Sequence, residues 1–212
     1  MMRYLRNNIG EPALSGVIPK GLPSFSGPSI GYTYDPEKAK QLLIEAGFSN
    51  SKPKITITTN AEYLDLCRYI QFQLNEVGFD ASIDVNPAAA LRELKAQTKL
   101  NFFRASWIAD YPDGENYLSM FYSKNFAPNG PNYTHYSNPK FDELYESALM
   151  ETDPQKRIAA YKMMDKMIMD DAVIVPMYYD QVLRFTQSNI EGLGVNAVNL
   201  LNLKRVKKID VE

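Results

Sequence analysis

The sequence has few of the residues that most catalytic and metal sites require. Among 212 residues it has one cysteine, Cys67, and one histidine, His135. A single cysteine excludes an intrachain disulfide and a cysteine-based zinc site. A single histidine excludes HExxH metalloproteases and metal triads with two histidines. Walker A, G-x-G-x-x-G and G-x-S-x-G motifs are also missing. We therefore expect neither a resident metal nor a cofactor, and no catalytic residues.

Long apolar runs and an excess of charge of either sign are also lacking. The longest apolar runs, such as residues 172–176, are far shorter than the ~20 residues of a membrane helix. The net charge of -2 does not favour nucleic acid or an anionic membrane as a partner. Met1–Arg3 leads into polar residues rather than into an apolar signal segment. The doubled methionine fits either an initiator added to an excised piece of a longer chain or a cytosolic protein that begins there.

Tyrosine, in contrast, is abundant. The chain has 14 Tyr, 10 Phe and 1 Trp, and tyrosine suits wet binding clefts because it joins an apolar ring to a polar hydroxyl. Residues 110–137 are rich in Tyr, Asn, Pro and Gly, with a short helix expected at 115–122. A loop of this length in a compact domain is usually functional, and its aromatic residues do not favour disorder.

The periodicity of the first half predicts an α/β fold. Prolines and glycines in residues 12–32 indicate an extended segment. A helix begins at Asp35-Pro36 and ends at Gly47. The regions that follow alternate as strand, helix, strand, helix, strand: 54–59, 66–77, 79–85, 87–94 and 100–107. This order predicts βαβ units and a mostly parallel sheet flanked by helices.

The second half is mainly helical. One amphipathic helix begins at Pro139 and another at Asp153-Pro154. Three further strands are expected at residues 173–179, 182–186 and 201–211. There is no internal repeat.

The candidate binding site lies where the strand at 100–107 ends, because ligands of open α/β sheets bind at the carboxyl ends of strands. Asp110 beside the ring of Trp107 suits a ligand ammonium group; alternatively, Trp107 belongs to the core and Asp110 caps a loop. Arg104 lies on the same strand. It binds either a ligand carboxylate or an internal acid, because a basic side chain is rarely buried without a partner.

Acidic residues at positions 110, 113 and 115 leave one enzymatic alternative. They lack the spacing of an EF-hand calcium loop, so a solvated acidic loop is the simpler interpretation. A carboxylate pair formed by Asp110 and Asp113 in a hydrolase is the alternative, although no residue that would orient a base is evident.

Several ordered motifs resemble the family 5 extracytoplasmic solute-binding proteins, which are the peptide- and nickel-binding receptors of ABC importers. The resemblance covers nearly the whole chain. It rests on the segments Gly16–Pro23, Tyr34–Phe48, Ser106–Asp113, Tyr136–Asp142 and Ile174–Tyr178.

This resemblance implies one lobe of a periplasmic-binding-protein-like fold (type II, cluster C). In this family two lobes close on a ligand, and the full protein is more than twice as long, so the chain resembles a C-terminal part. Residues 1–32 would be an extended opening segment and residues 33–186 the ligand-binding lobe. Residues 187–212 would pack with the missing N-terminal lobe.

The resemblance also implies roles for individual residues. Asp110 would bind the ammonium group of a peptide, with Trp107 beside it and Tyr111 continuing the segment. Arg104 would help to bind the peptide carboxylate, and a second basic position of the family falls near Lys95. The family usually has glycine immediately before the tryptophan. Here that residue is serine, which changes the shape of this part of the pocket.

The implied function is the binding of di- or oligopeptides by hinge closure, without bond chemistry. The partners would be a peptide and the permease subunits of an ABC importer. The parent protein would be extracytoplasmic and held at the membrane by a lipid anchor. A nickel chelate or an oligosaccharide is the alternative ligand on the same framework. We expect the 212-residue chain alone to bind weakly and to self-associate.

Overall fold

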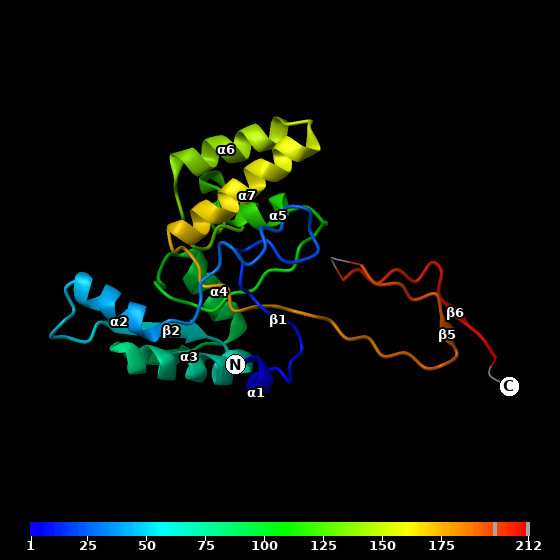
Figure 1. Ribbon diagram of the computed structural model, residues 1–212. Helices are drawn as coiled ribbons and strands as arrows, with labels where there is room; N and C mark the ends of the chain where they lie inside the picture. Colours follow the sequence, from blue (N-terminus) through cyan, green and yellow to red (C-terminus); the bar gives the residue numbers. More distant parts are fainter. Residues whose placement is uncertain (197–198, 211–212) are drawn as a thin grey trace.

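The computed structural model describes residues 1–196 and 199–210. They form a body of helices and small sheets, from which a C-terminal arm (residues 182–196 and 199–210) extends (Figure 1). In the body, a βαβ unit lies on one side and a layer of helices on the other (Figure 1). The opening segment of the chain crosses between them (Figure 1).

The βαβ unit forms as the sequence predicts. Strands β2 (Lys54–Thr59) and β3 (Asp80–Val85) pair in parallel, from Lys54 opposite Asp80 to Thr59 opposite Val85. Helix α3 (Leu64–Val77) connects them after a 3-10 turn. It ends at Gly78, whose φ of 118° is in the region that favours glycine. Helix α4 (Ala88–Ala96) follows β3.

The strand expected at residues 100–107 is reduced to a single parallel bridge. The N–H of Thr58 donates to the carbonyl of Phe102 (3.0 Å), and the N–H of Arg104 donates to the carbonyl of Thr58 (3.0 Å). The prediction of a full strand is wrong because β2 ends at Thr59 and the chain then turns into a 3-10 helix. The residues after Arg104 therefore have no neighbouring strand to pair with.

The helical layer consists of a short helix, α5 (Glu115–Leu118), and two long helices, α6 (Pro139–Met150) and α7 (Pro154–Asp170). The side chains of Asn138 and Asp153 accept backbone N–H groups at the starts of α6 and α7, which confirms both predicted helix starts. The main core lies between these helices and the opening segment. Its largest fully buried residues are Phe141, Ile18, Leu118, Met164 and Ile168.

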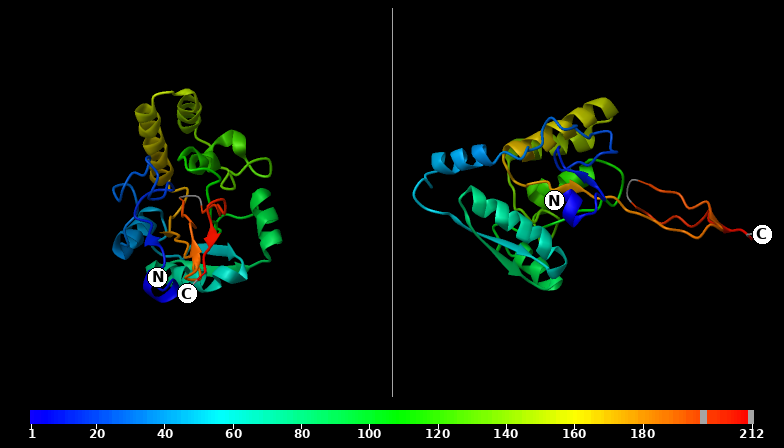
Figure 2. Two further views of the ribbon diagram at one scale, coloured as in Figure 1. Left: turned by 90° about the vertical axis from the view of Figure 1, so that its right-hand side faces the viewer. Right: turned by 60° about the horizontal axis from the view of Figure 1, so that its bottom comes forward.

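Helix α2 (Pro36–Glu45) is capped by Asp35, which accepts the N–H of Lys38, and it buries no residue. It lies at the far side of the body from the arm (Figure 2). Gly47 follows it at a φ of 90°, as predicted for the residue that closes this helix.

The opening segment contains helix α1 (Met2–Leu5) and strand β1 (Glu11–Pro12). Residues 13–35 contain neither helix nor strand. The carboxylate of Asp165, on α7, accepts the N–H of Val17 at 2.7 Å. This contact fixes the segment on the helical layer.

The C-terminal strands are shorter than the sequence predicts. Only β4 (Tyr178–Tyr179) forms within residues 173–179, and it pairs antiparallel with β1. Residues 182–186 form no strand. Strand β6 (Lys207–Lys208), paired with β5 (Ile190–Glu191), is all that forms within residues 201–210, and Val211 lies outside the described residues. The arm extends away from the body, so its backbone meets few partners for a ladder (Figures 1 and 2).

None of the helices in the described part of the chain is both long enough and apolar enough to cross a bilayer.

Candidate functional site

The predicted site lies on residues 104–113, which run from the edge of β2 toward α5. A buried amide holds this segment in place. Asn116 of α5 is only 4% exposed, and its Oδ1 accepts both the indole N–H of Trp107 (2.8 Å) and the backbone N–H of Asp110 (3.2 Å). The two residues predicted to act together are thus joined through one acceptor. The sequence analysis missed Asn116, which has no motif signal beyond its place after Asp110.

The carboxylate of Asp110 is available for a ligand. The residue is exposed, and no hydrogen bond or ion pair within residues 1–196 and 199–210 engages its side chain. Trp107 is only partly buried, so its ring is not a core side chain. The arrangement does not favour the alternative in which Asp110 merely caps the loop, because Asn116 rather than Asp110 accepts the local N–H groups.

The neighbouring acids have structural contacts. Asp113 accepts the backbone N–H of Glu115 (2.9 Å) and lies 3.5 Å from the guanidinium of Arg157. Glu115 accepts the hydroxyls of Tyr111 and Tyr145. Burial and the Glu115 carboxylate raise the pKa of Tyr111, so its hydroxyl stays protonated and remains a donor at neutral pH. Asp113 and Glu115 therefore have local partners, whereas Asp110 does not.

Arg104 does not form the internal salt bridge that was one of its two predicted roles. Its guanidinium carbon lies 3.1 Å from the centroid of the Tyr63 ring, and its Nη1 donates to Ser106 Oγ at 3.2 Å. No acid pairs with it in the part of the chain that the structure describes. The hydrogen bond to Ser106 holds the Arg104 and Ser106 side chains together.

Lys95 lies beside Arg104. Its ammonium group is 5.6 Å from the ring centroid of Phe103 and 5.1 Å from that of Tyr133. Its pKa is lowered, first by burial and then by the positive charges of Arg104 and Arg92. The sequence placed this position only by a weak match. The structure places it near the ring of Phe103, the residue before Arg104, and it adds Tyr63 and Tyr133, which no motif indicated.

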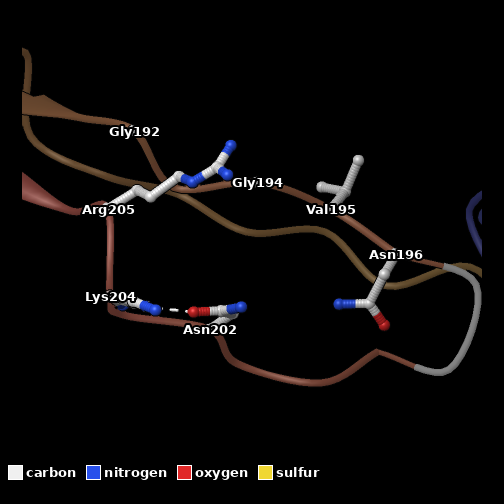
Figure 3. A pocket seen from close by; sticks show the side chains of 7 residues that line it. All are labelled: Gly192, Gly194, Val195, Asn196, Asn202, Lys204 and Arg205. Carbon is white, nitrogen blue, oxygen red and sulfur yellow. Dashed lines mark hydrogen bonds between the residues drawn. The ribbon is translucent and has the colours of Figure 1, made fainter.

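Two cavities are associated with the described residues. The larger, about 450 Å³, lies within the arm between the strands of its hairpin and is lined by Gly192, Gly194, Val195, Asn196, Asn202, Lys204 and Arg205 (Figure 3). The smaller, about 210 Å³, adjoins the predicted site and is lined by Tyr111, Asp113, Glu115, Ala148, Leu149, Arg157 and Tyr161. Of the residues predicted to bind the ligand, Tyr111 lines the smaller cavity, whereas Asp110, Trp107, Arg104 and Lys95 are not among its lining residues.

The sole histidine makes none of the contacts described above for the predicted site. The His135 ring packs against Phe126 at 5.2 Å between centroids, and neither ring nitrogen has a hydrogen-bond partner among the described residues. No group of three or more His, Cys, Asp or Glu side chains in the described residues can hold a metal ion.

Replacement of Asn116 by alanine tests how the site is held. We expect a loss of about 1–3 kcal/mol in the free energy of unfolding, because a buried acceptor of two N–H groups is removed. Trp107 is the sole tryptophan, so its fluorescence reports on the same change. We expect a red shift as the indole N–H turns to water. Asn116→Asp keeps the acceptor and is the control; equal spectra for both variants and the wild type would contradict the assignment.

The first part of the chain matches a known protein family. Residues 1–129, more than half of the chain, match the profile of the family described as "Bacterial extracellular solute-binding proteins, family 5 Middle". The chain belongs to this family. The resemblance seen in the motifs is thereby confirmed, and it places this solute-binding protein in a family of binding proteins rather than of enzymes.

Two curated relatives of this solute-binding protein are named for peptide ligands. The glutathione-binding protein GsiB of Escherichia coli (strain K12) is 28% identical in an alignment 197 positions long, gaps included, which covers 85% of this chain and 37% of GsiB. The dipeptide-binding protein DppE of Bacillus subtilis (strain 168) is 27% identical in an alignment 221 positions long, gaps included, which covers 98% of this chain and 40% of DppE. The chain thus spans about two fifths of the length of these relatives.

A solved structure confirms the predicted fold class. The ABC transporter-associated periplasmic binding protein DppA from Helicobacter pylori, in complex with the peptide STSA, superimposes with a TM-score of 0.81 at 25% identity. The match covers 98% of this chain and 41% of DppA. The solute-binding protein therefore has the α/β fold of one lobe of a periplasmic binding protein, as expected.

Proposed function

We propose that the chain forms one wall of a peptide-binding cleft in the solute-binding component of an ABC importer. The observation that carries the proposal is the exposed Asp110 carboxylate, which has no partner among the described residues, while the backbone N–H of Asp110 and the indole N–H of Trp107 share the Asn116 acceptor. Relatives named for glutathione and dipeptide binding support the same ligand class.

An extended peptide has an ammonium group at one end and a carboxylate at the other. Asp110 binds the ammonium group by charge-assisted hydrogen bonds, and the Trp107 ring adds a cation–π contribution. Arg104 binds the carboxylate and Lys95 adds positive charge near it, because neither has an acid partner in the described part of the chain. Side-chain variety is tolerated where water fills the remaining space.

The mechanism is hinge closure rather than bond chemistry. The ligand binds the closed arrangement of two lobes better than the open one, and so it shifts the population toward the closed state. The chain described here contributes the second lobe, residues 33–186. Residues 187–212 pack with the first lobe, which accounts for the way the described part of the arm extends away from the body (Figure 1). The complete protein works outside the cytoplasm, lipid-anchored, and passes peptides to the permease subunits.

Titration of the ¹⁵N-labelled chain with the tripeptide Ala-Ala-Ala, followed by NMR, tests this function. We expect weak, millimolar binding, because one wall buries only part of the ligand. The indole signal of Trp107 and the amide signals of Asp110 and Arg104 should shift together. Shifts confined to the arm, or none at all, would refute the proposed site.

The exposed apolar side chains of the arm lead us to expect self-association. Phe185 is 91% exposed and Val195 88%, and Leu201 is also exposed. Apolar surface of this extent rarely stays bare in a soluble protein. Light scattering at increasing concentration should show a mass above the monomer. The variant with serine at these three positions should remain monomeric, whereas serine at the exposed positions Leu42 and Ile44 of α2 should change nothing. A wild-type chain that stays monomeric would contradict the prediction.

A further inference from the structure

Three basic side chains gather at one place without an acid to balance them. Arg92 and Lys95 are one turn apart on α4, and Arg104 follows the bridge to β2. Positive charge from Arg104 and Arg92 acts on Lys95, and no acidic group contributes to its environment. Across residues 1–196 and 199–210, no hydrogen bond or ion pair joins any of the three to a carboxylate.

Aromatic rings hold two of these cations in fixed places. Arg104 lies over Tyr63, and Lys95 lies near both Phe103 and Tyr133. Contacts of this kind compensate a cation only in part, since a ring supplies a quadrupole and no net charge. Lys95 is moreover partly withdrawn from water. No carboxylate of the described residues neutralises the group, which leaves it able to bind an anion.

A single ligand carboxylate does not neutralise this group of cations. The terminal carboxylate of a peptide can form a forked pair with the guanidinium of Arg104, which presents two parallel donors. The ammonium group of Lys95 then still lacks a partner. A second ligand carboxylate within reach of Lys95 provides this partner and relieves the repulsion between Lys95 and Arg104.

We propose that the preferred ligands are peptides with two carboxylates at the carboxyl end, as in a terminal glutamate, bound by Arg104 and Lys95. This inference rests on the proposed function and adds the ligand class to it. Lys95 thereby acts as a specificity-determining residue, because it distinguishes an acidic terminal side chain from a neutral one of the same shape.

The test compares two tripeptides that differ only in charge, Ala-Ala-Glu and Ala-Ala-Gln, titrated into the ¹⁵N-labelled chain and followed by NMR. We expect the dissociation constant of Ala-Ala-Glu to be about tenfold lower, as is typical of one additional partly buried charged contact. Lys95→Met should bind the two peptides with equal affinity. Lys38→Met, at an exposed lysine of α2, is the matched control and should keep the tenfold preference.

The outcomes separate the inference from the function on which it rests. If neither peptide binds, the proposed function is wrong and the inference falls with it. If both bind equally to the wild type, or if Lys95→Met keeps the preference, the function stands and the inference is wrong. Inorganic phosphate that competes as well as Ala-Ala-Glu would also overturn it, because the site would then bind any anion.

Discussion

Asp110→Asn should weaken binding of Ala-Ala-Ala by about thirtyfold or more, equivalent to about 2 kcal/mol or more. The carboxylate is replaced by a neutral amide of almost the same shape, so the ammonium group of the ligand keeps its contacts but loses the opposite charge. Asn116 accepts the backbone N–H of residue 110, so the backbone position is kept in the variant. The effect on folding should therefore be small, and the NMR titration described above measures the loss directly.

An N-acetylated peptide separates this charge effect from a general loss of affinity. Acetylation removes the ammonium group, so N-acetyl-Ala-Ala-Ala should bind the wild-type chain as weakly as Ala-Ala-Ala binds the variant. The variant itself should be insensitive to acetylation. Asp84→Asn, at an exposed aspartate of β3, is the matched control and should leave the affinity unchanged. If acetylation weakens binding to Asp110→Asn as strongly as to the wild type, another residue binds the ammonium group.

The second large effect concerns the buried carboxylate of Asp165, and it appears as a dependence of stability on pH. Asp165 is 0% exposed, and its Oδ2 has no hydrogen-bond partner among the residues that the structure describes. Burial raises the pKa of Asp165 from 3.8 to about 6, although the N–H groups of Val17 and Ile18 act in the opposite direction. The folded chain therefore binds this proton more tightly than the unfolded chain does.

The folded state keeps the proton on Asp165 to higher pH than the unfolded state does. The stabilisation that this proton gives the folded state is therefore complete below about pH 4 and is lost as the pH rises through about 6. A difference of about two pKa units corresponds to about 3 kcal/mol in the free energy of unfolding. Asp165→Asn should remove this loss, because an amide stays neutral and still accepts the N–H of Val17. At pH 7 the variant should thus be more stable than the wild type.

Urea unfolding at pH 4.5 and pH 7 measures this effect as the difference between the wild type and Asp165→Asn. Taking the difference also removes the contribution of Glu146, whose pKa is lowered by Lys124 and which therefore acts with the opposite sign. Asp171→Asn, at an exposed carboxylate near the end of α7, is the control and should retain the wild-type slope between the two pH values. If the free energy of unfolding depends on pH equally in the wild type and in Asp165→Asn, ionisation of Asp165 does not destabilise the folded state and the prediction is wrong.

The position of Asp165 also explains a glycine in the opening segment. A Cβ atom at Gly16 would overlap the Asp165 carboxylate, so the backbone can approach α7 only without a side chain there. The hydroxyl of Tyr179 donates to the carbonyl of Gly16 at 2.9 Å, from the strand that leaves the body for the arm. Asp165 thus holds the segment that enters the body beside the segment that leaves it.

The sequence by itself determined the local elements and the family. Helix starts at Asp35-Pro36 and Asp153-Pro154 were predictable because a cap and the proline after it act within one turn. The βαβ unit was predictable because the spacing of its apolar residues changes from every second residue to every 3.6 residues and back. The segment with Trp107 and Asp110 was recognisable because a binding motif is contiguous in sequence.

The tertiary structure alone decided which segments pair and which charges meet. Whether residues 100–107 form a strand depends on where β2 ends, and the periodicity of residues 100–107 carries no information about that. The same holds for the arm, whose alternating pattern is not matched by a neighbouring strand along most of its length. The contact of Asn116 with Trp107 and the approach of Lys95 to Arg104 join separate elements. Such contacts depend on packing between segments, and no local rule of propensity or spacing specifies it.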